Sequence, residues 1–97
     1  DIFYFEYGPN RRVKLVATTG TWYLSSSMKS LEKQMESYGF LVPHKSFLVN
    51  PRQILSFGAE IQMKNHEMIP IAKNRRKQVH EQISTYLHNS LNINWRD

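Results

Sequence analysis

The sequence contains no cysteine, and this absence excludes several classes of protein and of site. Without thiols there can be no disulfide framework, cysteine nucleophile or thiolate zinc site, and such a chain suits a reducing cytoplasm. Long apolar runs are also missing, since none approaches the roughly 20 residues that a membrane-spanning helix needs. The first residues show no positively charged segment followed by an apolar core. We therefore expect neither a membrane span nor an export signal within the chain.

Acidic residues are scarce relative to basic ones. Eight Asp and Glu stand against 13 Lys and Arg, which gives a formal net charge of +5 and a pI near 9.7. This balance favours an anionic partner such as nucleic acid or membrane headgroups. With 97 residues, 40% of them hydrophobic, the chain suits a single domain over residues 1–97 with a modest core. It opens on strand-like residues without an initiator Met, and we expect this domain to be cut from a longer protein.

Motifs typical of enzymes are absent as well. The four histidines, His44, His66, His80 and His88, have no metal-ligand spacing such as the helical His-Glu-x-x-His. The sequence has no glycine-rich phosphate loop and no Gly-x-Ser-x-Gly elbow around a nucleophile. We therefore predict no enzyme activity, no metal site and no cofactor.

Short strands dominate the pattern of apolar residues. Strands rich in aromatic, β-branched or alternating apolar residues are predicted over residues 2–7, 13–18, 22–24, 47–50, 53–57, 60–64 and 68–72. Two other segments repeat apolar residues at helical spacing. The first follows Ser27, which can cap a helix, and stops at Gly39, which can take a left-handed conformation. The second runs from about Asn74 to His88, and a polar tail is predicted after Asn89.

Turn-forming residues separate the strands. Gly8-Pro9-Asn10 lies between the first two strands, Thr19-Gly20 precedes the third, and Asn65-His66 lies inside a hairpin nearer the C-terminus. Together, these elements predict a mainly β fold: a small domain of short antiparallel strands in compact sheets, with two peripheral helices.

The segment from His44 to Asn50, His-Lys-Ser-Phe-Leu-Val-Asn, is the most specific part of the sequence. It places basic and polar residues beside a short apolar strand that ends at an Asn-Pro break. A strand ending in Phe5-Glu6 and a basic loop with Arg11-Arg12 precede it, and Ile-Pro-Ile-Ala-Lys-Asn over residues 69–74 follows it. In order and spacing this series resembles the LytTR family of bacterial DNA-binding domains, which usually form the output end of response regulators that control transcription.

The resemblance implies a LytTR-like fold and sequence-specific binding of double-stranded DNA, with loops rather than a recognition helix in the major groove. Family members commonly bind direct repeats as two copies. The resemblance therefore also implies self-association, either on DNA or through segments outside this chain. The parent protein would then be a cytoplasmic regulator of a bacterial two-component system, with this domain as its C-terminal part.

Four cations stand within five residues, Lys73-Asn74-Arg75-Arg76-Lys77, at the predicted start of the last helix. Exposed cations at a helix N-terminus typically cost about 0.3–1 kcal/mol each because they oppose the helix dipole. Stability therefore does not explain the run. The free N–H groups of a first helical turn favour phosphate, and the cations complete an anion site suited to the DNA backbone. The alternative is a solvated basic face that keeps the domain soluble.

Arg11 and Arg12 follow a turn, so at least one of them should project into solvent. The resemblance implies that this first loop enters the major groove, where an arginine fork can bind guanine O6 and N7. It also makes Lys73 the counterpart of a second base-contacting arginine, although lysine binds as a point charge rather than a planar fork. Lys14 is out of phase with the apolar residues of its strand, and we expect an exposed lysine there rather than a phosphate contact.

The central segment combines structural and DNA-binding hypotheses. A histidine beside an apolar strand is more often a hydrogen-bonding structural residue, and we favour that role for His44 over DNA contact. Lys45 stands where the resemblance implies a residue that faces DNA, and Ser46 suits a phosphate bond or a local backbone bond equally. Asn50 precedes a proline and should shape a turn rather than read a base. The predicted DNA-binding set comprises Arg11, Arg12, His44, Lys45, Ser46, Lys73, Asn74, Arg75, Arg76 and Lys77.

Two other classes of function fit the same residues. A non-specific anion-binding module would use the basic strip for RNA or for an acidic membrane surface. Tyr4, Phe5, Trp22 and Tyr23 could form a stacking platform for single strands, but we expect all four in the core. In a protein-interaction domain the charge would be incidental, and binding would depend little on salt.

Overall fold

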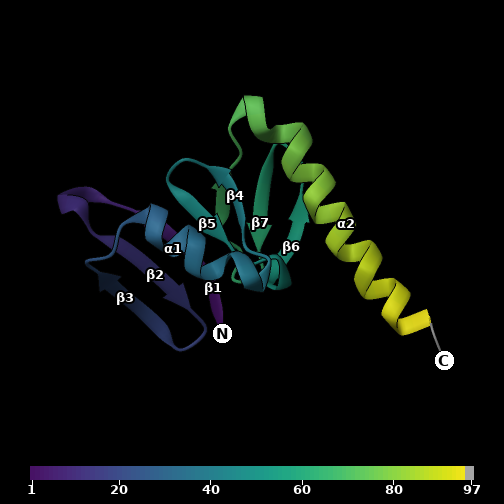
Figure 1. Cartoon of the computed structure of the whole chain (residues 1–97), viewed down its shortest axis with the longest axis horizontal. Helices are drawn as coiled ribbons and strands as arrows, with labels where there is room; N and C mark the ends of the chain where they lie inside the picture. Colours follow the sequence, from purple (N-terminus) through teal and green to yellow (C-terminus); the bar gives the residue numbers. More distant parts are fainter. Residues whose placement is uncertain (96–97) are drawn as a thin grey trace.

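The computed structural model describes the backbone of residues 1–95 and the side chains of residues 1–90, and over this range it contains eight β-strands and two α-helices (Figure 1). A five-stranded antiparallel sheet has the order β3-β2-β1-β5-β4, with β1 (Ile2–Tyr7), β2 (Val13–Ala17), β3 (Gly20–Leu24), β4 (Leu41–His44) and β5 (Phe47–Val49). A three-stranded sheet has the order β6-β7-β8, with β6 (Ile54–Phe57), β7 (Glu60–Met63) and β8 (Met68–Pro70). The helices are α1 (Met28–Met35) and α2 (Arg76–Trp95). The predicted mainly β fold with two helices is confirmed.

One face of the larger sheet lies beneath α1. Successive side chains of a strand point to opposite faces, and this face receives Phe5, Val13 and Leu48, all of them buried. Leu31 of α1 completes the cluster, and two methionines of the same helix pack against it. Figure 1 shows α1 lying across the sheet, so the amphipathic pattern of this short helix serves to cover one sheet face.

The opposite face of the larger sheet packs against the smaller sheet and α2. Tyr4 and Val49 from the larger sheet are buried with Ile61 and Met63 from β7 and with Val79 from α2. Full burial of a large apolar side chain contributes about 1.5–3 kcal/mol. This cluster therefore holds both sheets and the N-terminal half of α2 together, while the C-terminal part of α2 is directed away from the sheets (Figure 1).

A hydrogen bond from a buried tyrosine connects the larger sheet to the predicted hairpin of β7 and β8. The hydroxyl of Tyr4 donates to Oε1 of Glu67 at 2.8 Å, and the side-chain N–H of Asn65 donates to the same oxygen at 2.9 Å. His66 takes a left-handed conformation, with φ 72°, and makes the hairpin turn. Burial, reinforced by the Glu67 carboxylate, raises the pKa of Tyr4 above its ordinary value, so Tyr4 stays a neutral donor.

The predicted ends of the first helical segment are confirmed, whereas the predicted C-terminal end of the second helix is wrong. The hydroxyl of Ser27 accepts a hydrogen bond from the N–H of Ser30 at 3.1 Å, and Gly39, with φ 76°, follows the turn that ends this helical segment. At its other end, α2 continues to Trp95 instead of stopping near His88. Neither glycine nor proline interrupts the sequence from residue 76 to residue 95, so nothing there breaks the helix. No helix in the described part of the chain is long and apolar enough to cross a membrane.

Two features of the larger sheet differ from prediction. Strand β4, which contains Pro43, was not predicted; β4 lies at a sheet edge, where a proline removes no needed hydrogen bond. The core placement of Trp22 and Tyr23 was wrong, since these side chains are 48% and 61% exposed. They belong to β3, the opposite edge strand, which the covering layers leave largely open. Of the four aromatics expected in the core, Tyr4 is buried as predicted, and so is its neighbour on β1.

Candidate nucleic-acid interface

Three connections lie on one side of the molecule, at the end of the larger sheet where β1 turns into β2 and β4 turns into β5. Each connection carries basic residues. They are the β1–β2 connection (residues 8–12), the β4–β5 turn (residues 45–46) and the β8–α2 connection (residues 71–75). With the first residues of α2, they form a surface that we call the basic edge, defined as residues 8–12, 45–46 and 71–77. Figure 1 shows it running from the β1–β2 connection at the left tip to the start of α2 at the top.

Strand pairing places the first two connections at the same end of the sheet. Glu6, near the end of β1, pairs with Phe47 at the start of β5, and Phe47 pairs with His44 at the end of β4. On the other side of β1, Tyr7 pairs with Val13 at the start of β2. In antiparallel pairs the end of one strand lies beside the start of the next, so both connections leave the sheet side by side.

Backbone hydrogen bonds join the three connections to one another. The N–H of Tyr7 donates to the carbonyl of Ser46 at 2.9 Å, which links the end of β1 to the β4–β5 turn. The N–H of Ala72 donates to the carbonyl of Pro43 at 2.9 Å, which fixes the β8–α2 connection beside β4. The basic edge is therefore held in place by the main chain, and its exposed side chains are free for other contacts.

The β1–β2 connection is a compact turn. It contains the 3₁₀ helix η1 (Pro9–Arg11), and the N–H of Gly8 donates to the carbonyl of Arg12 across its base at 2.9 Å. Asn10 and Arg11 take left-handed conformations, with φ 62° and 57°, which is uncommon for residues other than glycine. Arg11 and Arg12 are both exposed, so the expectation that at least one projects into solvent is confirmed.

His44 organises the β4–β5 turn through its ring. Nδ1 accepts a hydrogen bond from the N–H of Ser46 at 3.1 Å, and the ring lies edge-on to Phe47, with the centroids 5.8 Å apart. An acceptor at Nδ1 places the proton of a neutral imidazole on Nε2. This geometry agrees with the structural role favoured for His44. Lys45 is exposed at the tip of the turn, whereas Ser46 is half-buried. Lys45 is therefore the side chain that this turn offers to a ligand.

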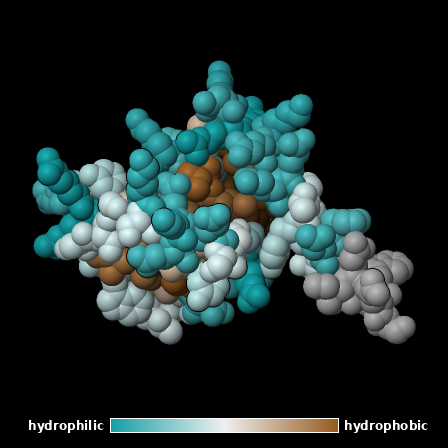
Figure 2. All heavy atoms as spheres, viewed as in Figure 1, coloured by the Kyte–Doolittle hydropathy of each residue, from teal (hydrophilic) through white to brown (hydrophobic). Residues whose placement is uncertain are grey.

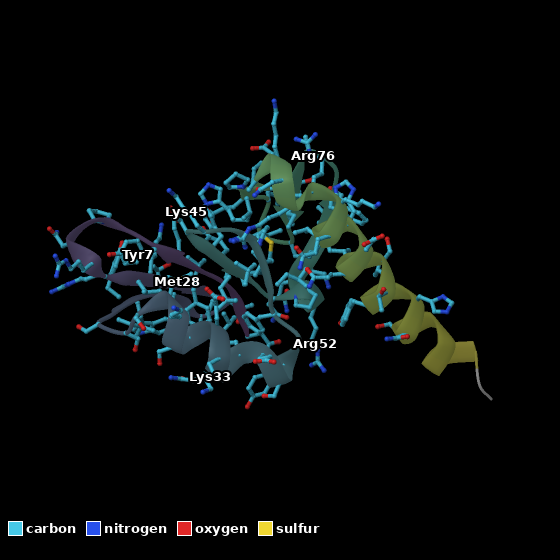
Figure 3. The ribbon with its side chains drawn as sticks, turned by 45° about the horizontal axis from the view of Figure 1, so that its top comes forward. Tyr7, Met28, Lys33, Lys45, Arg52 and Arg76 are labelled. Atoms are coloured by element: carbon cyan, nitrogen blue, oxygen red, sulfur yellow. The ribbon has the colours of Figure 1, made fainter. Side chains whose placement is uncertain are left out.

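The start of α2 presents the predicted cluster of cations. The 3₁₀ helix η4 (Lys73–Arg75) leads into the α-helix, and among residues 73–77 only Arg75 is not exposed. Arg75 is half-buried, and its Nη1 donates to the carbonyl of Val42 in β4 at 3.0 Å. Its guanidinium is thus partly committed to the fold, although four further N–H donors remain. Figure 3 shows Lys45 and Arg76 on the same side of the molecule.

No lysine or arginine of the basic edge forms an ion pair with a carboxylate among the residues that the structure describes. Cations that lie together without neutralisation create a positive potential, which attracts polyanions and raises their rate of association. Figure 2 shows hydrophilic side chains gathered over the upper part of the molecule, where α2 begins. Among the described side chains, no group of three His, Asp or Glu is placed to hold a metal ion.

Asn50 lies at the opposite end of β5 from the basic edge. Its side-chain N–H donates to the carbonyl of Ile2 at 2.7 Å, and its oxygen accepts from the N–H of Arg52 at 3.1 Å. The side chain is buried and caps the 3₁₀ helix η3 (Pro51–Gln53). The prediction that Asn50 shapes a turn is confirmed. Arg52 likewise lies far from Lys45 and Arg76 in Figure 3.

Sequence reasoning missed one residue of this region. Tyr7 closes β1 directly beside the basic edge, and its ring is 44% exposed although it continues an apolar strand. Its position as the last strand residue before Gly8 could have indicated this exposure, because a side chain at the end of a strand lies beyond the helix and the second sheet that cover the middle of the larger sheet.

Comparison with known proteins identifies a family and a fold. The family model for the LytTr DNA-binding domain matches residues 1–84. Among solved structures, the chain is similar to the LytTr DNA-binding domain of a proposed methyl-accepting/DNA response regulator from Bacillus cereus. The identity is 19% and the TM-score 0.75, with 84% of this chain and 80% of that chain covered, so the likeness shows a shared fold. No curated protein matches the chain.

Proposed function

The chain belongs to the LytTr DNA-binding domain family, and from this premise we propose that it binds a specific sequence of double-stranded DNA and thereby regulates transcription. The basic edge is the contact surface in this proposal. Its connections enter the major groove, and the first turn of α2 lies on the phosphate backbone. No recognition helix is required.

The observation that carries the proposal is the meeting of three separate basic connections on one edge. Residues 8–12, 45–46 and 71–77 come from distant parts of the sequence, and main-chain hydrogen bonds hold them together. A basic surface that served only solubility would need no such arrangement. A duplex requires several contacts along one line, because phosphate contacts set the position of a protein and base contacts set its specificity.

Each part of the basic edge has its own role in this proposal. Arg11 and Arg12 read bases from the β1–β2 connection, since the arginine fork matches the O6 and N7 acceptors of guanine. Lys45 contacts DNA from the β4–β5 turn, and Lys73 does so from the β8–α2 connection as a point charge. Asn74, Arg75, Arg76 and Lys77 bind phosphate at the start of α2, where the positive end of the helix dipole favours an anion.

The proposal includes a wider setting. Two copies bind a direct repeat, and each domain alone binds its half-site weakly. Segments outside this chain bring the copies together and raise their effective concentration on the DNA. The parent protein is a cytoplasmic response regulator in a bacterial two-component system, and this domain is its C-terminal output.

Selection from a random duplex pool, followed by fluorescence anisotropy, tests the proposal. The domain should enrich one duplex sequence and bind it more tightly than a scrambled duplex or its own single strand at the same salt concentration. The logarithm of the affinity should fall steeply with the logarithm of salt concentration, because each neutralised phosphate releases counterions. Equal, weak binding to all three nucleic acids would refute sequence-specific recognition.

Single substitutions test the assigned roles. Arg12→Ala and Lys73→Ala should reduce the preference for the selected duplex over the scrambled one, whereas Arg76→Ala should weaken both about equally and reduce the salt slope by roughly 1. Lys33→Ala, on α1 and away from the basic edge in Figure 3, removes the same charge as a control and should change neither quantity. Equal losses on both duplexes for the three edge variants would contradict base reading by these connections.

Exposed aromatics favour one rival function. Trp22 and Tyr23 are open on β3 and could stack on unpaired bases, as in single-strand binding domains. Tighter binding to the single strand than to the selected duplex would support that rival. A protein-interaction domain would instead bind no nucleic acid in a salt-dependent way.

A further inference from the structure

A small open cleft lies beside the β1–β2 connection, on the sheet face opposite α1. Its volume is about 390 Å³, and it is lined by Glu6, Gly8, Pro9, Asn10, Arg12, Lys14 and Tyr23. Glu6 and Lys14 have no role in the proposed function, and Lys14, which was expected to be an exposed strand lysine, is half-buried and lines this cleft. The cleft borders the basic edge but extends from it onto the surface of the sheet.

Strand register brings the side chains of the cleft together. Lys14 in β2 pairs directly with Tyr23 in β3 and with Glu6 in β1, so the three side chains stand in one row across one sheet face. The neighbouring row on this face contains the buried Tyr4 and Val16, which the smaller sheet and α2 help to cover. That cover stops before β3, because Tyr23 is 61% exposed.

The donors in the cleft suit a phosphate group. Lys14 and Arg12 supply two cations, neither of which forms an ion pair within the described residues, and the hydroxyl of Tyr23 supplies a neutral donor without a partner there. Glu6 is half-buried and stands opposite Lys14, so the cleft keeps a net positive charge when all three ionise. A phosphodiester carries one negative charge and several acceptor oxygens, which matches this set.

We propose that Lys14 and Tyr23 in this cleft bind a backbone phosphate of the DNA, on the strand that flanks the groove entered by the β1–β2 connection. The inference rests on the proposed function and extends it to a second, separate phosphate site. Arg12 lies at the boundary between the two, because it belongs to the connection that reads bases and also lines one side of the cleft. The domain thus holds the DNA on both sides of its first connection and at the start of α2.

The test uses two conservative variants with matched controls. Lys14→Gln removes the charge but keeps a polar side chain, and Tyr23→Phe removes only a hydroxyl. Lys33→Gln on the opposite side of the sheet makes the same charge change, and Tyr38→Phe removes the hydroxyl of a tyrosine that is 70% exposed and outside the cleft. Far-ultraviolet circular dichroism spectra and thermal melts show that each variant is folded at the assay temperature.

The two variants should give different signatures in anisotropy titrations. Lys14→Gln should weaken binding to the selected and scrambled duplexes alike by about 3- to 10-fold and reduce the salt slope by about 1. Tyr23→Phe should weaken both by about 3-fold with an unchanged salt slope, since no charge is lost. Glu6→Gln should strengthen binding to both duplexes. Lys33→Gln and Tyr38→Phe should match the wild type.

The outcomes separate this inference from the proposed function. Sequence-specific binding by the wild type, with a salt slope that Lys14→Gln leaves unchanged, would overturn the cleft as a phosphate site while the proposed function stands. The same reduction in slope with Lys33→Gln would also overturn it, because any lysine would then serve. A wild-type domain that binds no duplex would refute both.

Discussion

Arg75 and Arg76 are neighbours with the same charge, and replacing each by alanine separates support of the basic edge from contact with DNA. Arg76 is exposed, whereas Arg75 is half-buried and its Nη1 donates to the carbonyl of Val42 at 3.0 Å. Loss of Arg76 removes only a charge from the surface. Loss of Arg75 removes the same charge and also the side-chain link between the start of α2 and β4.

The two substitutions should differ in their effect on the free energy of unfolding. A hydrogen bond from a charged donor contributes about 1.5–3 kcal/mol, and because Arg75 is only half-buried we expect Arg75→Ala to cost about 1–2 kcal/mol in free energy of unfolding. In a domain of this size that loss lowers Tm by roughly 5–15 °C. Arg76→Ala should stay within about 0.5 kcal/mol of the wild type, as exposed substitutions usually do. Both variants should bind scrambled duplex more weakly and with a reduced salt slope.

Thermal unfolding, monitored by circular dichroism, measures the loss of stability. Anisotropy titrations at several salt concentrations measure the loss of DNA binding. Arg75→Lys serves as a control, because it keeps the charge but not the planar fork of donors. It should recover most of the salt slope and less of the stability. Equal Tm values for Arg75→Ala and Arg76→Ala would refute the reasoning, since the bond to Val42 would then contribute nothing.

Three further predictions concern the frame of the domain. Asn50→Ala should lower the free energy of unfolding by about 2–3 kcal/mol, because it leaves the carbonyl of Ile2 and the N–H of Arg52 without their hydrogen-bond partner. The preference between duplexes in anisotropy should stay unchanged. Burial raises the pKa of Tyr4, so the folded state keeps a proton that the unfolded state loses above about pH 10. The free energy of unfolding should therefore fall as pH rises beyond that value, by up to about 1.4 kcal/mol per pH unit. Denaturant titrations of Tyr4→Phe should show a smaller fall over the same pH range. Gly39→Ala, at φ 76°, should cost about 1 kcal/mol in thermal melts, whereas Gly58→Ala, with open space around it and no left-handed φ, should be close to neutral.

Local patterns were enough to predict most elements of this fold. Ser27 and Gly39 marked the helix ends by their own chemistry, and the turn at Asn65-His66 followed from residues that accept left-handed conformations. Edge strands were harder. Strand β4 was missed and Trp22 was expected in the core, because whether a strand lies at an edge depends on pairing between distant segments.

The candidate site was predictable as a set of residues but not as a surface. The basic run at residues 73–77 and the His-Lys-Ser segment could be read directly, and both lie on the basic edge. The His-Lys-Ser segment lies beside residues 8–12 because β1 pairs with β5 across more than 40 positions, and the bond from Ala72 to Pro43 places the basic run beside β4. The hydrogen bond of Arg75 to Val42 and the row of Glu6, Lys14 and Tyr23 depend on the same long-range register, which no local window contains.

The bonds that join the three connections of the basic edge run from main chain to main chain, at Tyr7 to Ser46 and at Ala72 to Pro43. Such bonds do not depend on which side chain stands at the tip of a connection. Arg12, Lys45 and Lys73 lie outside both apolar clusters, so exchanging them leaves the frame intact. In the proposed function these tips contact the DNA, so single substitutions there would change operator preference with little loss of stability to be repaired elsewhere.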